Sequence, residues 1–267
     1  MSGHEGEATE AERTGQGVGY ALRETFSQSW DYVQLLIVGS FLWALSWVLP
    51  LIPLGLLGLT TPLVIPVTLA VAALSVGPAT MGLYGLAAQM RRRELPHVRD
   101  FFDGFVRWFV PGVLWFLINV FVLLLGVVAV WFYGTQFDHW FTRALSVVCL
   151  YIMAFWLAAQ LYTPAFLVRE DSRVGLALKR ALFLTLAHPG YSAIVLVQVV
   201  ALLALVIVPV LMRWGAVVGV SFIVFFLVLP CFAALAGTNA MEDLIRAHLA
   251  ADEGEAAAED EDADGND

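Results

Sequence analysis

The sequence predicts an all-α polytopic membrane protein, with six transmembrane helices and additional interfacial amphipathic helices. Three observations lead to this prediction. Of the 267 residues, 60% are hydrophobic and 14% are charged, and the mean hydropathy is +0.80, whereas soluble domains average about half apolar and a quarter charged. Six apolar runs are long enough to cross ~30 Å of hydrocarbon at ~1.5 Å per helical residue. The basic residues concentrate in alternate connections between these runs.

The first polar residues lack the apolar core and small-residue cleavage site of a signal peptide, so we expect the first apolar run to be the membrane anchor. We predict a disordered N-terminal segment at 1–19, a six-helix transmembrane domain at 20–240 and an acidic disordered tail at 241–267. The tail follows from residues 242–267, which hold eleven acids against one Arg and have no apolar side chain larger than Ala after Leu249. The six predicted spans are 33–53, 63–89, 109–133, 144–168, 192–212 and 214–236.

The orientation follows from the basic side chains, because Lys and Arg resist translocation. An N-terminus inside the cell assigns twelve of the 14 basic residues to the cytoplasmic side and leaves only Arg143 and Arg213 outside. Six spans then place both termini in the cytoplasm, in a multi-pass protein of the cytoplasmic (plasma) membrane.

The cytoplasmic connections carry amphipathic patterns. Residues 98–109 place aromatic residues at helical spacing on one face and charged residues on the other, which predicts an interfacial helix. A second such helix is predicted at 172–187 with Ser172 as its N-cap, and a third precedes the first span, around Tyr20 to Trp30. The predicted membrane-interface residues are Phe101, Phe102, Phe105, Trp108, Arg91, Arg92 and Arg93.

These segments also suggest an internal repeat. Each amphipathic segment is followed by an outward and a returning span, and the returning spans carry Pro78, Pro164 and Pro230 near their cytoplasmic ends. An intramembrane proline frees a carbonyl group, so each is expected to pack against protein. One interpretation is three repeated helical hairpins. The other is that kinks and basic loops fall where any six-span protein has them, since proline is common in such helices.

Asp, Glu, Lys, Arg and His are absent from the central two thirds of every predicted span. Ion-coupled pumps and proton relays need such groups at depth, so this class is disfavoured. In the fourth span, polar and sulfur-containing residues form one stripe: Ser146, Cys149, Met153, Trp156, Gln160 and Thr163. The stripe is either a packing seam or the wall of a solute passage, and the packing seam is favoured. Asn119 is the expected partner across it.

Enzyme signatures are absent from the sequence, as are phosphate-binding glycine loops and Cys-x-x-Cys pairs. The five histidines are scattered without ligand spacing, so neither a metal site nor a cofactor is predicted. An excess of acids over bases argues against a nucleic-acid partner. We therefore expect a protein that is not an enzyme.

Three motifs carry a resemblance to a known family: Leu42-Trp43-Ala44-Leu45, the block Gly77-Pro78-Ala79-Thr80-Met81-Gly82-Leu83-Tyr84, and Phe101-Phe102-Asp103-Gly104-Phe105. Together they resemble the YesL-like family of prokaryotic integral membrane proteins of unknown function. A longer proline-containing segment separates the first two motifs here than in that family. The resemblance implies association with carbohydrate uptake and breakdown, and it brings no catalytic residues. It makes Gly77, Pro78, Ala79, Thr80 and Tyr84 candidates for binding or helix packing.

Two functions remain open at this stage. The first is an accessory or regulatory component of a membrane system, such as carbohydrate uptake, which acts through its basic amphipathic helices. The second is a facilitative transporter or channel for a neutral small solute, with Asn119, Gln160 and Gln198 facing a shared cavity. The expected partners are the lipid bilayer and another membrane protein or transport complex.

Overall fold

The computed structural model describes residues 30, 32–57, 62–92, 96–135, 140–171, 173–190, 192–193, 197 and 230–246. Within these ranges the chain is helical and has no strand. The helices are, in chain order, α2 (Val33–Val48), α3 (Leu51–Leu57), α4 (Val64–Arg92), α5 (Val98–Arg107), α6 (Phe109–Thr135), α7 (Trp140–Glu170) and α8 (Val174–Ala187), and a further helical segment covers 230–246.

Four helical stretches of the described residues are long and apolar enough to cross a membrane: Val33–Pro53, Val64–Arg91, Phe109–Thr135 and Trp140–Glu170. They coincide closely with the first four predicted spans, so the chain has the character of a membrane protein. Most of the fifth predicted span and most of the sixth lie outside the described residues, as do residues 1–29 and 247–267. The first span is divided at Pro50, where α2 gives way to α3, because proline has no N–H to continue a helix.

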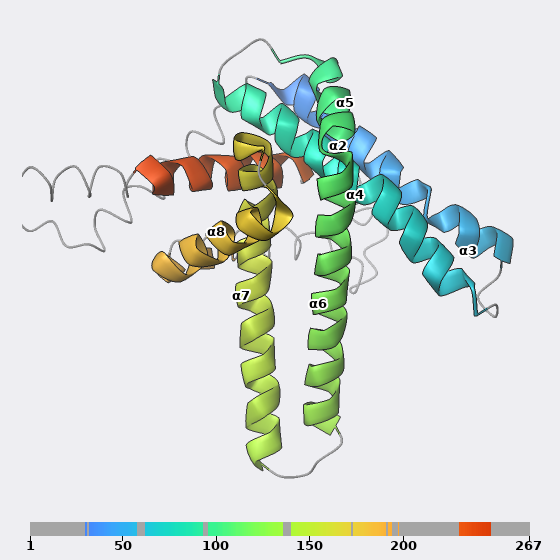
Figure 1. Cartoon of the computed structure of the whole chain (residues 1–267), viewed down its shortest axis with the longest axis vertical. Helices are drawn as coiled ribbons and strands as arrows, with labels where there is room; N and C mark the ends of the chain where they lie inside the picture. The colour runs from blue at the N-terminus through green and yellow to red at the C-terminus, as the bar shows by residue number, and fades with distance from the viewer. Residues whose placement is uncertain are drawn as a thin grey trace, which may run out of the picture.

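The long helices form two groups (Figure 1). The helices α6 and α7 stand side by side as an antiparallel hairpin, while α2, α3 and α4 form a second group inclined to that hairpin. The two groups meet where Gly77 of α4 lies against Gly112 of α6. A Cβ atom built at Gly77 would lie 2.5 Å from the Gly112 carbonyl oxygen, so only glycine permits this approach. The helix α8 and segment 230–246 lie crosswise beside the upper part of α7.

The core lies where α4, α7, α8 and segment 230–246 meet. Its largest fully buried apolar side chains include Met81, Leu83, Leu86, Tyr162, Leu235 and Met241. The opposite halves of α6 and α7 expose large apolar side chains instead, among them Phe121, Leu124, Trp131, Phe141, Leu150 and Ile152. A continuous apolar surface of this kind fits contact with lipid chains rather than with water.

The structure corrects the predicted environment of Phe101, in the helix that the sequence predicted at 98–109 and that spans Val98–Arg107. This helix, α5, packs across α4, and Phe101 is only 3% exposed against Gly82. Phe102 remains 51% exposed, whereas Phe105 and Trp108 are half-buried against the core. The amphipathic pattern located the apolar face correctly, but periodicity alone does not distinguish a lipid neighbour from a protein neighbour.

The end of the membrane domain also differs from the prediction. Helical structure in segment 230–246 continues past residue 240, and Met241 and Leu244 are buried in the core. The acidic composition around these two residues led to the prediction of a disordered tail, although their spacing fits one face of a helix. Residues 241–246 therefore belong to the helical domain and not to a tail that begins at 241.

Candidate functional site

The block Gly77 to Tyr84 lies in α4, and its residues connect α4 to several neighbouring helices. Gly77, Pro78 and Ala79 are buried, so the proline inside α4 is surrounded by protein, as the sequence predicted. The Thr80 hydroxyl donates to the Val76 carbonyl at 2.8 Å and accepts the indole N–H of Trp43 at 3.0 Å. The Thr80 side chain therefore ties α2 to α4 directly after Pro78.

Tyr84 joins α4 to α7. Its hydroxyl donates to the Leu161 carbonyl oxygen at 2.9 Å, in the turn that precedes Pro164. Segment 230–246 closes on the same point, because a Cβ built at Gly237 would lie 2.6 Å from the Leu161 oxygen and 3.3 Å from the Tyr84 hydroxyl. Three helical elements thus converge at the Tyr84 hydroxyl.

Asn119 of α6 and Gln160 of α7 meet in a hydrogen-bonded network with two indoles. The Asn119 side-chain nitrogen donates to Gln160 Oε1 at 2.9 Å, and Trp115 Nε1 donates to the same oxygen at 2.8 Å. Trp156 Nε1 donates to Asn119 Oδ1 at 3.1 Å. The prediction that Asn119 is the partner of the polar stripe on the fourth span is confirmed.

The rest of the stripe contacts α6 and the core. The Ser146 hydroxyl donates to the Val130 carbonyl at 3.2 Å, and Met153 packs against Gly126. The Thr163 hydroxyl bonds within its own helix, to the Ala159 carbonyl. The outer part of the stripe is therefore a packing seam, as favoured from the sequence, while Gln160 also borders a cavity.

This cavity has a volume of about 480 Å³ and lies among α2, α4, α6, α7 and the start of segment 230–246. Four predicted residues meet on its wall: Thr80, Tyr84, Asn119 and Gln160. Gln198 and Arg93 lie outside the described residues. The remaining described lining is apolar or aromatic and carries no charge: Trp43, Trp47, Val76, Leu83, Trp115, Phe116, Val120, Leu123, Leu157, Leu161, Pro164, Pro230, Ala233 and Ala234. A concave, mostly apolar site with a few converging polar groups is typical of small-molecule binding.

Sequence reasoning did not single out Trp43 and Trp115 as site residues. Trp43 belongs to the Leu-Trp motif of the first span, and Trp115 precedes Asn119 by one helical turn. Both indoles donate to a side chain on another helix. The position of Trp115 one helical turn before the amide of Asn119 could have indicated its role, because an indole N–H in hydrocarbon must find an acceptor.

Comparison of the chain with protein-family models, with curated proteins and with solved structures finds no match.

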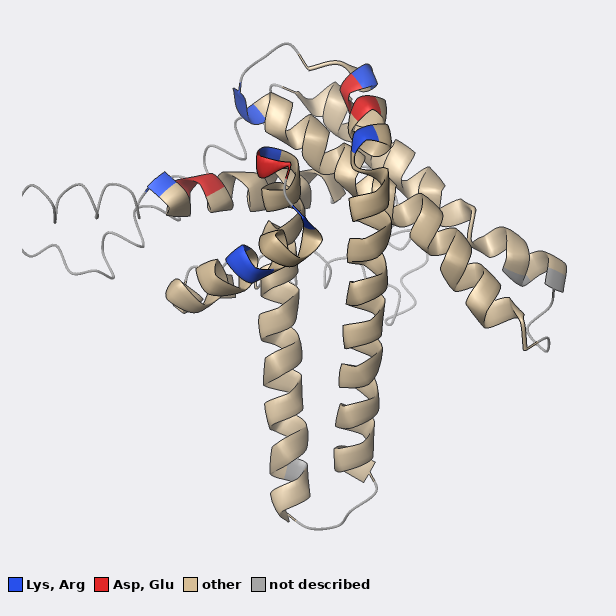
Figure 2. Cartoon of the chain, in the orientation of Figure 1, with Lys and Arg blue, Asp and Glu red and all other residues tan. Residues whose placement is uncertain are grey.

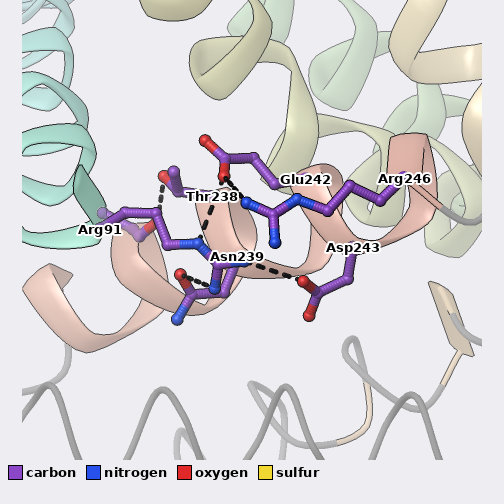
Figure 3. Close-up of polar contacts among 7 residues, drawn as sticks. Arg91, Thr238, Asn239, Glu242, Asp243 and Arg246 are labelled. Atoms are coloured by element: carbon purple, nitrogen blue, oxygen red, sulfur yellow. Dashed lines mark hydrogen bonds and ion pairs between the residues drawn. The ribbon is translucent and has the colours of Figure 1, made fainter.

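A second polar site lies at the charged end of the helices, around Arg91 (Figure 3). The Arg91 guanidinium donates to Asn239 Oδ1 at 2.9 Å, Glu242 Oε2 at 3.2 Å and Asp243 Oδ1 at 2.9 Å, all on segment 230–246. The Arg91 side chain is only 8% exposed. We expected Arg91 at the membrane interface, but it lies inside a cluster of ion pairs, while Arg92 is exposed. The spacing of basic residues along the sequence does not show which acidic side chains lie beside them, when those acids belong to a helix far away in the sequence.

Asp171 forms a third polar contact, between the ends of α5 and α7. It follows the last residue of α7 with a φ of 49°, a left-handed conformation that ends the helix. Its carboxylate accepts from Trp108 Nε1 at 2.9 Å and from Arg107 at 3.1 Å. The hydrogen bonds from Arg107 and then Trp108 lower the pKa of Asp171. A mixed-charge cleft of about 370 Å³, lined by Arg92, Asp100 and Arg169 among others, adjoins this contact.

The lowered pKa of Asp171 predicts a pH dependence. The folded state favours the carboxylate, so its contribution to stability is present above the unfolded pKa of about 3.9 and is lost as the pH falls below it. We expect Asp171→Asn, which keeps an acceptor and tolerates positive φ, to lower the unfolding temperature slightly at pH 7, since exposed pairs contribute little. Thermal unfolding in detergent from pH 7 to pH 3 should show this difference from the wild type shrink as the pH falls through the unfolded pKa toward the lowered folded pKa. A difference that is as large at pH 3 as at pH 7 would contradict the electrostatic origin.

Within the described ranges, no group of three or more His, Cys, Asp or Glu side chains is placed to hold a metal ion. The chemistry offered by the cavity is hydrogen bonding from neutral amide, indole and hydroxyl groups inside an apolar enclosure.

Proposed function

We propose that this chain is an integral protein of the cytoplasmic membrane that assists or regulates a membrane system, such as carbohydrate uptake, and does not catalyse a reaction. The observation that carries the proposal is the cavity of about 480 Å³, whose described lining bears no charged side chain. A neutral molecule can enter it at low desolvation cost, whereas an ion cannot. The described lining also lacks a nucleophile paired with a general base.

A surface suited to a partner supports the same proposal. On α8, Leu176, Phe183 and Leu186 are exposed, and Lys179 lies 5.8 Å from the centre of the Phe183 ring. An apolar ridge with basic flanks fits either lipid headgroups or an acidic segment of another membrane protein. The helix α8 packs on α7, which carries Gln160, so a movement of α7 at the cavity can be transmitted to this surface through the contact between the two helices.

The test is affinity purification of the full chain from native membranes in a mild detergent. We expect a second membrane protein to co-purify, and we expect Phe183→Asp on α8 to release it. The matched control is Phe121→Asp, on the half of α6 that lies away from α8. Partner retention is measured for this variant after its insertion into the membrane has been verified. A chain that purifies alone under several detergent conditions would refute the accessory role.

The alternative is a facilitative transporter or channel for a neutral small solute. It is favoured by the position of Asn119 and Gln160, which share one cavity wall with the Thr80 hydroxyl. Reconstituted liposomes should then swell in iso-osmotic sugar or polyol solutions faster than empty liposomes. Equal swelling rates across a series of sugars and polyols would reject this alternative while leaving the accessory role in place.

We further propose six spans in three repeated hairpins, with both termini in the cytoplasm. Each predicted returning span contributes to the cavity, through Thr80, Pro164 and Pro230 respectively. The coloured charged residues gather at the upper helix ends and on the crosswise helices, and α6 and residues 144–168 of α7 carry none (Figure 2). An alkaline phosphatase fusion at residue 137 should be active, and a fusion at 171 should be inactive. The opposite pattern would overturn this topology.

A further inference from the structure

One polar atom of a residue that lines the cavity has no hydrogen-bond partner. Gln160 is 9% exposed, and among the described residues that line the cavity its Nε2 is a buried side-chain nitrogen without a hydrogen-bond partner. Inside a membrane no bulk water is present to satisfy such a donor, so its burial costs free energy. An unpaired donor on a cavity-lining residue calls for an explanation, and a ligand that a small shift of the Gln160 side chain brings into contact with Nε2 supplies one.

The orientation of the Gln160 amide is fixed by groups that can only donate. An indole N–H has no acceptor function, so the atom that faces Trp115 must be the amide oxygen. Trp156 likewise requires the oxygen of Asn119, which leaves the Asn119 nitrogen to donate to Gln160 Oε1. Exchanging oxygen and nitrogen in either amide would oppose donor to donor. Nε2 is therefore the atom left free.

The surroundings of Nε2 define the chemistry of its partner. Gln160 Oε1 already accepts two hydrogen bonds, so a ligand group that only accepts complements the site best. The uncharged walls require a neutral molecule, and the indoles of Trp43, Trp47 and Trp115 favour one with an apolar body. Trp47 and Leu157 line the cavity and are also exposed on the outer surface, so the ligand can enter from the bilayer.

We propose that the cavity binds a neutral, lipid-soluble carbonyl compound, whose carbonyl oxygen accepts a hydrogen bond from Gln160 Nε2. This inference rests on the proposed function and names the class of its ligand. Two sources carry the required group in a membrane: the ring of a quinone and the ester of an acyl chain. Both present an acceptor-only oxygen on an apolar body.

The binding test uses the full chain in detergent and a decyl-substituted benzoquinone as the probe, read through quenching of tryptophan fluorescence. Methyl laurate and dodecane, matched in chain length, serve as competitors with and without a carbonyl group. We expect the ester to displace the quinone at a concentration about tenfold lower than dodecane, which corresponds to ~1.4 kcal/mol. Tighter binding of the quinone than of the ester identifies the ring as the source, and the reverse identifies the ester.

Failure of the inference is distinguishable from failure of the proposed function. If quinone, ester and dodecane all bind equally well, the cavity is a binding site but the carbonyl proposal is overturned. If none of them binds, the ligand-binding function itself is overturned with it.

A variant separates the hydrogen bond from the cavity. Gln160→Met keeps the length of the side chain and removes the donor; it is combined with Trp115→Phe so that no indole loses its acceptor, while the Asn119 nitrogen still donates to the backbone carbonyl at position 115. We expect the tenfold preference for ester over dodecane to fall to about one in this double variant while dodecane still binds, and to persist in Trp115→Phe alone. Gln34→Met is the matched control, because Gln34 is an exposed amide on α2 outside the cavity. A preference that survives in the double variant would overturn the proposal.

A measurement on the wild-type chain covers the case in which the double variant does not fold. A quinone labelled with ¹³C at its carbonyl carbon should show an infrared carbonyl band at lower frequency when bound than in dodecane, because the oxygen accepts a hydrogen bond. A bound probe with an unshifted carbonyl band would overturn the proposal without any substitution.

Discussion

Replacing Arg91 with methionine is expected to destabilise the folded protein by about 3–5 kcal/mol, the usual result of removing one partner of a buried ion pair. The Arg91 side chain is almost fully enclosed and contacts Asn239, Glu242 and Asp243 on a helix far away in the sequence. Its removal leaves the partly buried Asp243 carboxylate without its ion-pair partner and Glu242 with only the exposed Arg246, 3.8 Å away. Thermal unfolding of the full chain in detergent, followed by size-exclusion chromatography after heating, measures the loss.

Arg92→Met is the control for the loss of a positive charge at the same helix end. Arg92 is exposed, so this substitution should change stability by no more than about 0.5 kcal/mol. Combining Arg91→Met with Glu242→Gln and Asp243→Asn should recover much of the loss, because no uncompensated charge then remains. If Arg91→Met and Arg92→Met are equally mild, the cluster does not hold segment 230–246 in place.

The substitution Gly77→Ala is expected to cost about 1–3 kcal/mol, as is usual when an atom is forced into a packed contact. The added Cβ would lie 2.5 Å from the Gly112 carbonyl oxygen, 2.8 Å from the carbonyl carbon and 3.1 Å from Phe116. Backbone atoms cannot yield as a flexible side chain does, so α4 and α6 must separate. Because Phe116 lines the cavity, this separation should also weaken binding of the decyl benzoquinone probe.

Gly175→Ala provides the matched control. A Cβ atom added at Gly175 of α8 would have no neighbouring atom within 4 Å, so alanine should be neutral or stabilise by up to about 1 kcal/mol through helix propensity. Unfolding temperatures of both variants in one detergent give the comparison. Similar behaviour of Gly77→Ala and Gly175→Ala would show that α4 and α6 are not in close contact at Gly77.

The spans were predictable from the sequence because the length of an apolar run directly sets whether a helix can cross hydrocarbon. The contact between Asn119 and the stripe of the fourth span was also predictable, since a buried amide between two adjacent spans has few other partners. Gly77 and Tyr84 were flagged only through the family resemblance. Their actual contacts, with Gly112 and Leu161, depend on how the helices cross.

The charge cluster was not predictable from local patterns. Arg91 and Glu242 are separated by 151 positions, and composition alone assigned one to a basic interface and the other to an acidic tail. Phe101 shows the same limit, because its helix has the pattern of a membrane-surface helix although α4 covers it. In each case the partner is set by tertiary packing.

The Arg91 cluster also governs how the protein can be shortened for expression or crystallisation. A stop codon placed directly after Ala240, where the acidic residues begin, would delete Glu242 and Asp243. The enclosed Arg91 guanidinium would then lose both carboxylate partners. A stop codon after Arg246 would discard most of the acidic residues and retain both carboxylates.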